Sequence, residues 1–121
     1  ELSTWVEVVG ELETLAAMAN LADLNPGWTW PNVEPTAQEL TASNIAHPLI
    51  PVDRRVANDV SLGPPGTVLI VTGSNMAGKS TLLREVGLNV VLARAGGPVC
   101  AESLEVGNFA VWSSVRSRRR A

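Results

Sequence analysis

The chain has 121 residues, enough for one small domain with one hydrophobic core. Its 45% share of hydrophobic residues argues against disorder of the chain as a whole, and its single cysteine, Cys100, excludes an internal disulfide. No apolar run approaches the roughly 18 residues that span a bilayer, so we expect a cytoplasmic protein with no membrane partner.

The positive charge is concentrated at the C-terminal end. Of nine Lys and Arg residues, four lie within RSRRR at 116–120, which leaves five against 12 acidic residues in the preceding part, a net charge of 5 − 12 = −7. A body this acidic is a poor binder of the nucleic-acid backbone by itself.

The first part of the chain is predicted to form one long helix followed by a connector. Apolar residues recur at three- and four-residue steps over residues 2–24, which is the period of an amphipathic helix. The segment NPGW at 25–28 should end this helix, because proline cannot continue it and glycine supplies a turn. We expect an irregular, proline-rich connector to follow, in which Trp28 and Trp30 attach the chain to a core.

The second part is predicted to contain strands around one helix. RVANDVSL at 55–62 alternates as a half-buried strand does, and TVLIV at 67–71 has the continuous β-branched character of a central strand. A helix is expected over 78–94, with Leu82, Leu83, Val86, Val90 and Ala93 facing the sheet. Two further strands are predicted at PVCA (98–101) and FAVWSSV (109–115).

A loop between the apolar run at 67–71 and the second helix carries the chemistry. It matches G-x-x-x-x-G-K-[ST], in which glycines let the backbone approach phosphate and the helix start attracts anions. Lys79 should reach the β- and γ-phosphates of a nucleotide, and the Ser80 hydroxyl should complete the coordination of Mg²⁺. The alternative is a structural glycine turn. The predicted phosphate-binding residues are Gly73, Ser74, Asn75, Met76, Ala77, Gly78, Lys79, Ser80 and Thr81.

The segment TGSNMAGKSTLLREVG at 72–87 resembles the phosphate loop of the MutS family of DNA mismatch-repair ATPases, usually T-G-P-N-M-x-G-K-S-T. The Asn75-Met76 pair separates it from transporter ATPases, kinases and GTPases. AHPLI, RVANDVSL and ARAGGPVCAESLEV are similar to further segments of the family, and the opening helix resembles its lever helix. The resemblance implies an α/β fold, with an incomplete P-loop NTPase core of ABC type preceded by a long amphipathic lever-like helix.

The same resemblance implies four parts of the chain. They are the end of the lever helix at 1–25, a connector at 26–44, a partial P-loop ATPase domain at 45–115 and a basic tail at 116–121. The implied cofactors are ATP and Mg²⁺. DNA would be bound by parts of the parent protein outside this chain, and the intact family member would form a homodimer.

Three positions depart from the usual pattern of the family. Ser74 replaces a proline, and PVCAE replaces V-P-A, which indicates a divergent branch. Arg55 and Val56 fall where the family contacts adenine, often with an aromatic ring. A guanidinium group can also stack on a purine, so both residues are predicted adenine contacts.

No complete catalytic set is predicted. After the loop the only carboxylates are Glu85, Glu102 and Glu105, and none follows an apolar strand in the acidic pattern that P-loop ATPases use for Mg²⁺ and water. We therefore expect the ATP-binding portion of a MutS-related ATPase that does not turn over ATP by itself. Two alternatives remain open: a non-enzymatic binding or self-associating module, and a fragment of another DNA-repair ABC-type ATPase.

Overall fold

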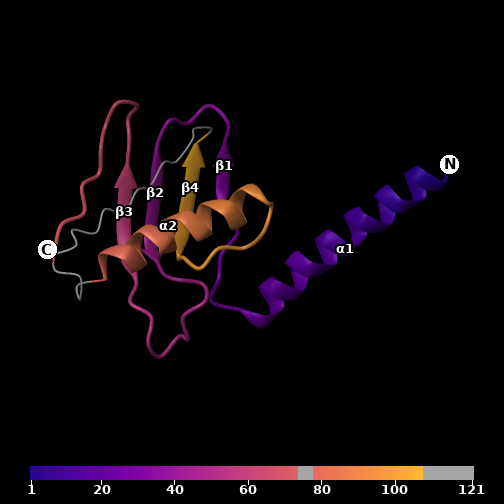
Figure 1. Cartoon of the computed structure of the whole chain (residues 1–121), viewed down its shortest axis with the longest axis horizontal. Helices are drawn as coiled ribbons and strands as arrows, with labels where there is room; N and C mark the ends of the chain where they lie inside the picture. The colour runs from indigo at the N-terminus through magenta and orange to yellow at the C-terminus, as the bar shows by residue number, and fades with distance from the viewer. Residues whose placement is uncertain (74–77, 108–121) are drawn as a thin grey trace, which may run out of the picture.

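The computed structural model describes residues 1–73 and 78–107. Two helices and four strands form this part of the chain (Figure 1): α1 (Leu2–Leu24), β1 (Asn32–Glu34), β2 (Leu40–Ile45), β3 (Asn58–Leu62), α2 (Lys79–Arg94) and β4 (Ser103–Gly107). The predicted α/β class and the long N-terminal helix are confirmed.

The four strands make one mixed sheet in the order β1-β4-β2-β3. β2 is antiparallel to both β3 and β4, whereas β1 runs parallel to β4. Leu40 pairs with Val106, and both side chains are fully buried, while the next pair, Thr41 and Glu105, is exposed. This alternation gives the sheet one apolar face and one polar face.

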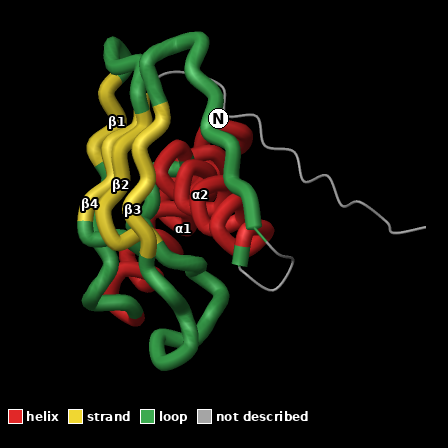
Figure 2. Tube along the Cα trace, turned by 90° about the vertical axis from the view of Figure 1, so that its left-hand side faces the viewer, coloured by secondary structure: helices red, strands yellow, loops and turns green. Residues whose placement is uncertain are grey.

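Helix α2 covers the apolar face of the sheet (Figures 1 and 2). Val90 and Ala93 of α2 are buried there, and Leu82 and Val86 pack at the margin. The buried core consists of Leu40, Ala42, Ile45, Val60, Val90, Ala93, Val99, Ala101, Leu104 and Val106. The single layer of helix on sheet therefore holds α2, whose first residues belong to the predicted motif, against β1 and β2.

Helix α1 has the predicted bounds but extends away from the sheet (Figure 1). It ends at Asn25, whose side-chain amide donates a 2.9 Å hydrogen bond to the Leu21 carbonyl oxygen. None of its residues is buried, and Leu2, Trp5, Val9 and Leu12 are all exposed. In the described ranges, no helix combines the length and apolar character needed to cross a membrane.

The central strand predicted at 67–71 is wrong for this structure. Residues 67–71 form no strand, and the side chains of Val68, Leu69 and Ile70 are 80%, 49% and 76% exposed. A β-branched run becomes a strand only where a neighbouring strand pairs with its backbone. Among the described residues, the preceding strand β3 pairs with β2 alone, so 67–71 has no partner.

The strand predicted at 98–101 is also wrong. Within it only Val99 makes an isolated bridge, to Thr29, and the strand β4 begins later, at Ser103. Pro98 has no backbone N–H to donate to a ladder, and the chain bends before Ser103. The strand predicted at 109–115 lies outside the described residues.

Two strands lie where the sequence predicts the connector. The stretch 26–44 contains β1 and most of β2. β1 is three residues long, so it is too short to show an alternating pattern. In β2, the polar residues Ser43 and Asn44 lie between Ala42 and Ile45, where the pairing with β3 shifts register. This shift interrupts the alternating pattern of the strand.

Candidate functional site

The predicted phosphate loop leads into the first turn of α2. Gly78 is the N-cap residue and has a φ of 76°, a left-handed conformation that glycine adopts without the steric strain of a side chain. Lys79 and Ser80 are the first two residues of the helix, and with Thr81 they are half-buried. The backbone N–H groups of this turn carry the positive end of the helix dipole, which favours an anion.

The side chain of Lys79 spans the loop. Its Nζ donates a hydrogen bond to the carbonyl oxygen of Gly73, the residue that opens the predicted motif. The structure therefore brings Gly73 to the side chain of Lys79, while Gly78, Ser80 and Thr81 are the neighbours of Lys79 along the chain. Residues 74–77, which include Ser74, Asn75, Met76 and Ala77 of the prediction, lie outside the described residues.

The two predicted adenine contacts lie on the segment before β3. Arg55 is half-buried, and its Nη1 donates to the Sγ of the buried Cys100 at 2.9 Å. Burial raises the pKa of the Cys100 thiol above its ordinary value, although the positive charge of Arg55 acts in the opposite direction. The thiol therefore stays protonated at neutral pH. Val56 is exposed. No hydrogen bond in the described ranges joins Arg55 or Val56 directly to Gly73 or to residues 78–81.

The sheet-facing side of α2 carries two polar residues that the sequence prediction missed. Asn89 is fully buried, and its Nδ2 donates to the carbonyl oxygens of Ala46 (2.9 Å) and Glu85 (2.8 Å). Its Oδ1 accepts the backbone N–H of Cys100 at 2.7 Å. Asn89 therefore links α2 to the segment before β3 and to the segment before β4.

Glu85, one turn before Asn89, is only 2% exposed. Its Oε2 accepts a hydrogen bond from Asn58 Nδ2 at 3.1 Å, which joins α2 to the first residue of β3. Burial raises the pKa of the Glu85 carboxyl above its ordinary value of 4.5, and the Asn58 hydrogen bond and the nearby His47 oppose this rise.

Replacing Glu85 with glutamine should increase stability at neutral pH. A raised pKa means that the wild-type carboxyl contributes stability that is fully present below about pH 4.5 and is lost as pH rises through the folded-state pKa. Glutamine keeps an oxygen acceptor for Asn58 and has no charge to bury. Urea unfolding between pH 4.5 and 8 measures the free energy of unfolding of both proteins. The Glu85→Gln variant should have the larger value, and its advantage over wild type should grow as pH rises.

An advantage that is constant with pH, or that shrinks, would contradict this account of Glu85. The control is Glu105→Gln, which removes a negative charge from an exposed strand position. It tests whether any loss of acidic charge produces the same trend.

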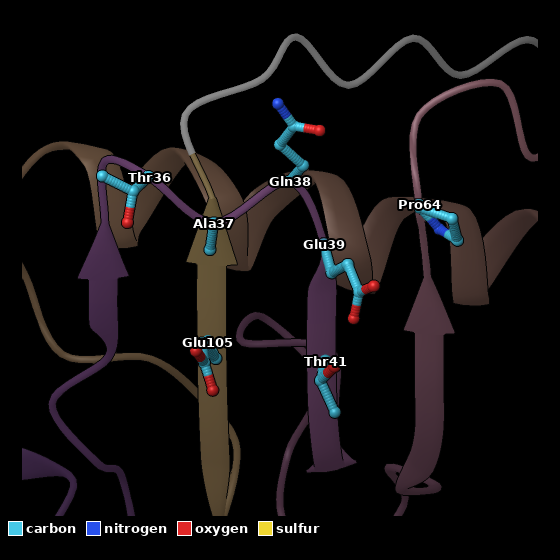
Figure 3. A pocket seen from close by; sticks show the side chains of 7 residues that line it. All are labelled: Thr36, Ala37, Gln38, Glu39, Thr41, Pro64 and Glu105. Carbon is cyan, nitrogen blue, oxygen red and sulfur yellow. The ribbon is translucent and has the colours of Figure 1, made fainter.

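A shallow pocket of about 370 Å³ lies on the polar face of the sheet, away from α2 (Figure 3). Figure 3 shows the side chains of Thr41 on β2, Glu105 on β4 and Glu39, just before β2, pointing away from α2. The residues that line the pocket include two carboxylates and no cation: they are Thr36, Ala37, Gln38, Glu39, Thr41, Pro64 and Glu105. Such a pocket repels phosphate, so the start of α2 is the stronger candidate site.

Two further polar residues, His47 and Glu102, have structural roles. His47 accepts the Leu49 backbone N–H at Nδ1 over 3.2 Å, within a turn. Glu102 is exposed, and its Oε2 accepts a 2.6 Å hydrogen bond from Asn44 Nδ2. In the described ranges, no group of three or more His, Cys, Asp or Glu side chains is placed to hold a metal ion.

The chain thus has an α/β fold in which the helix that covers the sheet begins directly after the predicted phosphate loop, and a glycine stands at each end of that loop. The family described as MutS domain V matches residues 69–118. The DNA mismatch repair protein MutS of Chlorobaculum tepidum is 40% identical over 111 residues, and that of Salinibacter ruber is 37% identical over 107 residues. These matches cover 88% and 84% of the chain. The chain belongs to the MutS family.

The chain spans about 12% of the length of these relatives. The DNA mismatch repair protein MutS of Chlorobaculum parvum is 40% identical over 107 residues, and the match likewise covers 12% of the length of that protein. The activity of such a relative as a whole can therefore be carried to this chain only as a proposal.

Proposed function

We propose that this chain is the ATP-binding portion of a cytoplasmic MutS-type ATPase with a P-loop core. Residues 73–81 would bind the phosphates of ATP, with Lys79 on the β- and γ-phosphates and Ser80 on Mg²⁺. Arg55 and Val56 would contact the adenine base. The observation that carries the proposal is the motif itself, with Lys79 bound to Gly73 across the loop and Gly78 in the left-handed conformation at the helix start.

The residues present fit a Mg–nucleotide. The first turn of α2 offers backbone N–H groups that have no partner within the helix and an ammonium group for phosphate, and the Ser80 hydroxyl is a hard oxygen ligand of the kind that Mg²⁺ accepts. Bound Mg²⁺ would neutralise phosphate charge. The relatives are named DNA mismatch repair proteins, so the proposal includes DNA binding by the intact protein.

Helix α1 has a defined place in this proposal. Most of its apolar side chains are exposed, while Met18, Leu21 and Ala22 near its end are half-buried, and residues 1–25 correspond to the lever-like part of the sequence prediction. In the intact homodimer, α1 would pack against other parts of the protein and couple ATP binding to DNA binding.

Titration with a nucleotide series tests the proposal. We expect the chain to bind Mg–ATP and Mg–ADP more tightly than AMP, because each phosphate removed takes away charge-assisted hydrogen bonds of about 1.5–3 kcal/mol each. Isothermal titration calorimetry with and without EDTA measures these affinities and the contribution of Mg²⁺.

The same samples should release no phosphate from ATP above the level of a Lys79→Ala variant, because no acidic strand motif follows the loop in the sequence. Equal binding of AMP and ATP would contradict the proposed phosphate site. Phosphate release that depends on Lys79 would contradict the claim that this chain is not catalytic by itself.

A further inference from the structure

The segment Arg55–Asn58 is held at both ends by groups that return to α2. At one end, Asn58 Nδ2 donates to Glu85 Oε2 at 3.1 Å. At the other end, Arg55 Nη1 donates to Cys100 Sγ at 2.9 Å, and the Cys100 backbone N–H donates to Asn89 Oδ1 at 2.7 Å. Asn89 Nδ2 donates in turn to the Glu85 carbonyl oxygen at 2.8 Å, which closes the circuit.

This circuit lies inside the molecule. Glu85 is 2% exposed and Asn89 is fully buried, so water competes little for their hydrogen bonds. Both positions face the sheet, and at position 85 an aliphatic side chain would avoid the penalty of desolvating a carboxylate. Polar side chains at these positions instead define one arrangement of the segments that they join.

Helix α2 connects the two parts of the proposed nucleotide site. Its first turn holds Lys79 and Ser80, and it holds Glu85 and Asn89 roughly two and three turns further along. One helix thus determines the positions of both Lys79 and Ser80 and the segment that carries Arg55 and Val56.

We propose that Glu85 and Asn89 are positioning residues for nucleotide binding, which hold Arg55–Asn58 at a fixed place relative to the phosphate loop. The proposal rests on the proposed function. One nucleotide can be bound at base and phosphates together only if these two parts keep a constant separation. The contact of Arg55 with Cys100 is made by one edge of the guanidinium group, through Nη1.

The test compares two probes that differ only in the nucleoside. Mg–tripolyphosphate reports on the phosphate loop alone, and Mg–ATP reports on the loop and the base segment together. Glu85→Leu keeps the bulk of the side chain but cannot accept the hydrogen bond of Asn58. We expect this variant to lower the affinity for Mg–ATP about tenfold and to keep the affinity for Mg–tripolyphosphate within about twofold of the wild-type value.

Three further variants complete the experiment. Glu85→Gln keeps an oxygen acceptor and should bind Mg–ATP as wild type does. Asn58→Ala removes the same hydrogen bond from the β3 side and should repeat the selective loss, which keeps the test valid if Glu85→Leu fails to fold. Val60→Ala shortens a core side chain of the same strand and should change both affinities by one common factor.

The outcomes separate this inference from the proposed function. Equal weakening of both probes by Glu85→Leu and Asn58→Ala, or no weakening of either, would overturn the positioning role. So would a Glu85→Gln variant that behaves like Glu85→Leu. A wild-type chain that binds both probes equally, with binding lost in Lys79→Ala, would overturn the inference and leave phosphate binding standing. Wild-type binding of neither probe would overturn both.

Discussion

The Lys79→Ala variant is expected to lose nearly all affinity for Mg–ATP while keeping the fold. The Lys79 ammonium group contacts Gly73 and would make charge-assisted hydrogen bonds to phosphate, so its removal should cost about 2–3 kcal/mol, or roughly 30- to 140-fold in Kd. Isothermal titration calorimetry measures the change.

Stability should barely change in this variant, since Lys79 contributes to no core contact. A urea midpoint within the error of wild type would show that the lost affinity comes from the site. The matched control is Arg84→Ala, which removes an exposed cation from the same helix and should leave the affinity unchanged. Retained affinity in Lys79→Ala would contradict a phosphate role for this lysine.

The Asn89→Leu variant is expected to be the most destabilised of the substitutions considered. Leucine has the same number of side-chain heavy atoms and the same branching, but it leaves the Ala46 carbonyl oxygen and the Cys100 N–H without the partners that Asn89 provides, and both residues are buried. Each unsatisfied buried group costs about 1–3 kcal/mol, so a total loss of roughly 2–5 kcal/mol is expected. This is a large fraction of the stability of a small domain.

Urea unfolding monitored by tryptophan fluorescence measures this loss as a lower midpoint with an unchanged m-value. Arg84→Leu on the exposed side of α2 is the control and should stay within about 0.5 kcal/mol of wild type. A midpoint for Asn89→Leu equal to that of the control would show that the hydrogen bonds of Asn89 do not hold the surrounding segments together.

Features set by neighbouring residues were predictable from the sequence. The helix over 2–24 and the helix that starts after Gly78 follow from local periodicity and from proline and glycine, and their bounds are confirmed. The glycines and Lys79 of the loop follow a fixed spacing, which is why the candidate site could be named before the fold.

Features set by distant residues were not predictable. The run at 67–71 has strong strand propensity, yet in the described ranges no strand pairs with it, whereas the short β1 exists because β4 lies beside it. Glu85 and Asn89 were missed because only apolar residues were counted along α2. Their spacing from Leu82, Val90 and Ala93 places them on the same face, and that spacing is the signal that could have found them.

The central claim is that residues 73–81 bind the phosphates of ATP. Backbone amide chemical shifts of the ¹⁵N-labelled chain, recorded during a titration with Mg–ATP, test it most directly. The account predicts shift changes concentrated in residues 73–81, smaller ones at Arg55 and Val56, and none in either region for Lys79→Ala. Changes confined to the acidic pocket around Glu39 and Glu105, or no change at millimolar Mg–ATP, would contradict it.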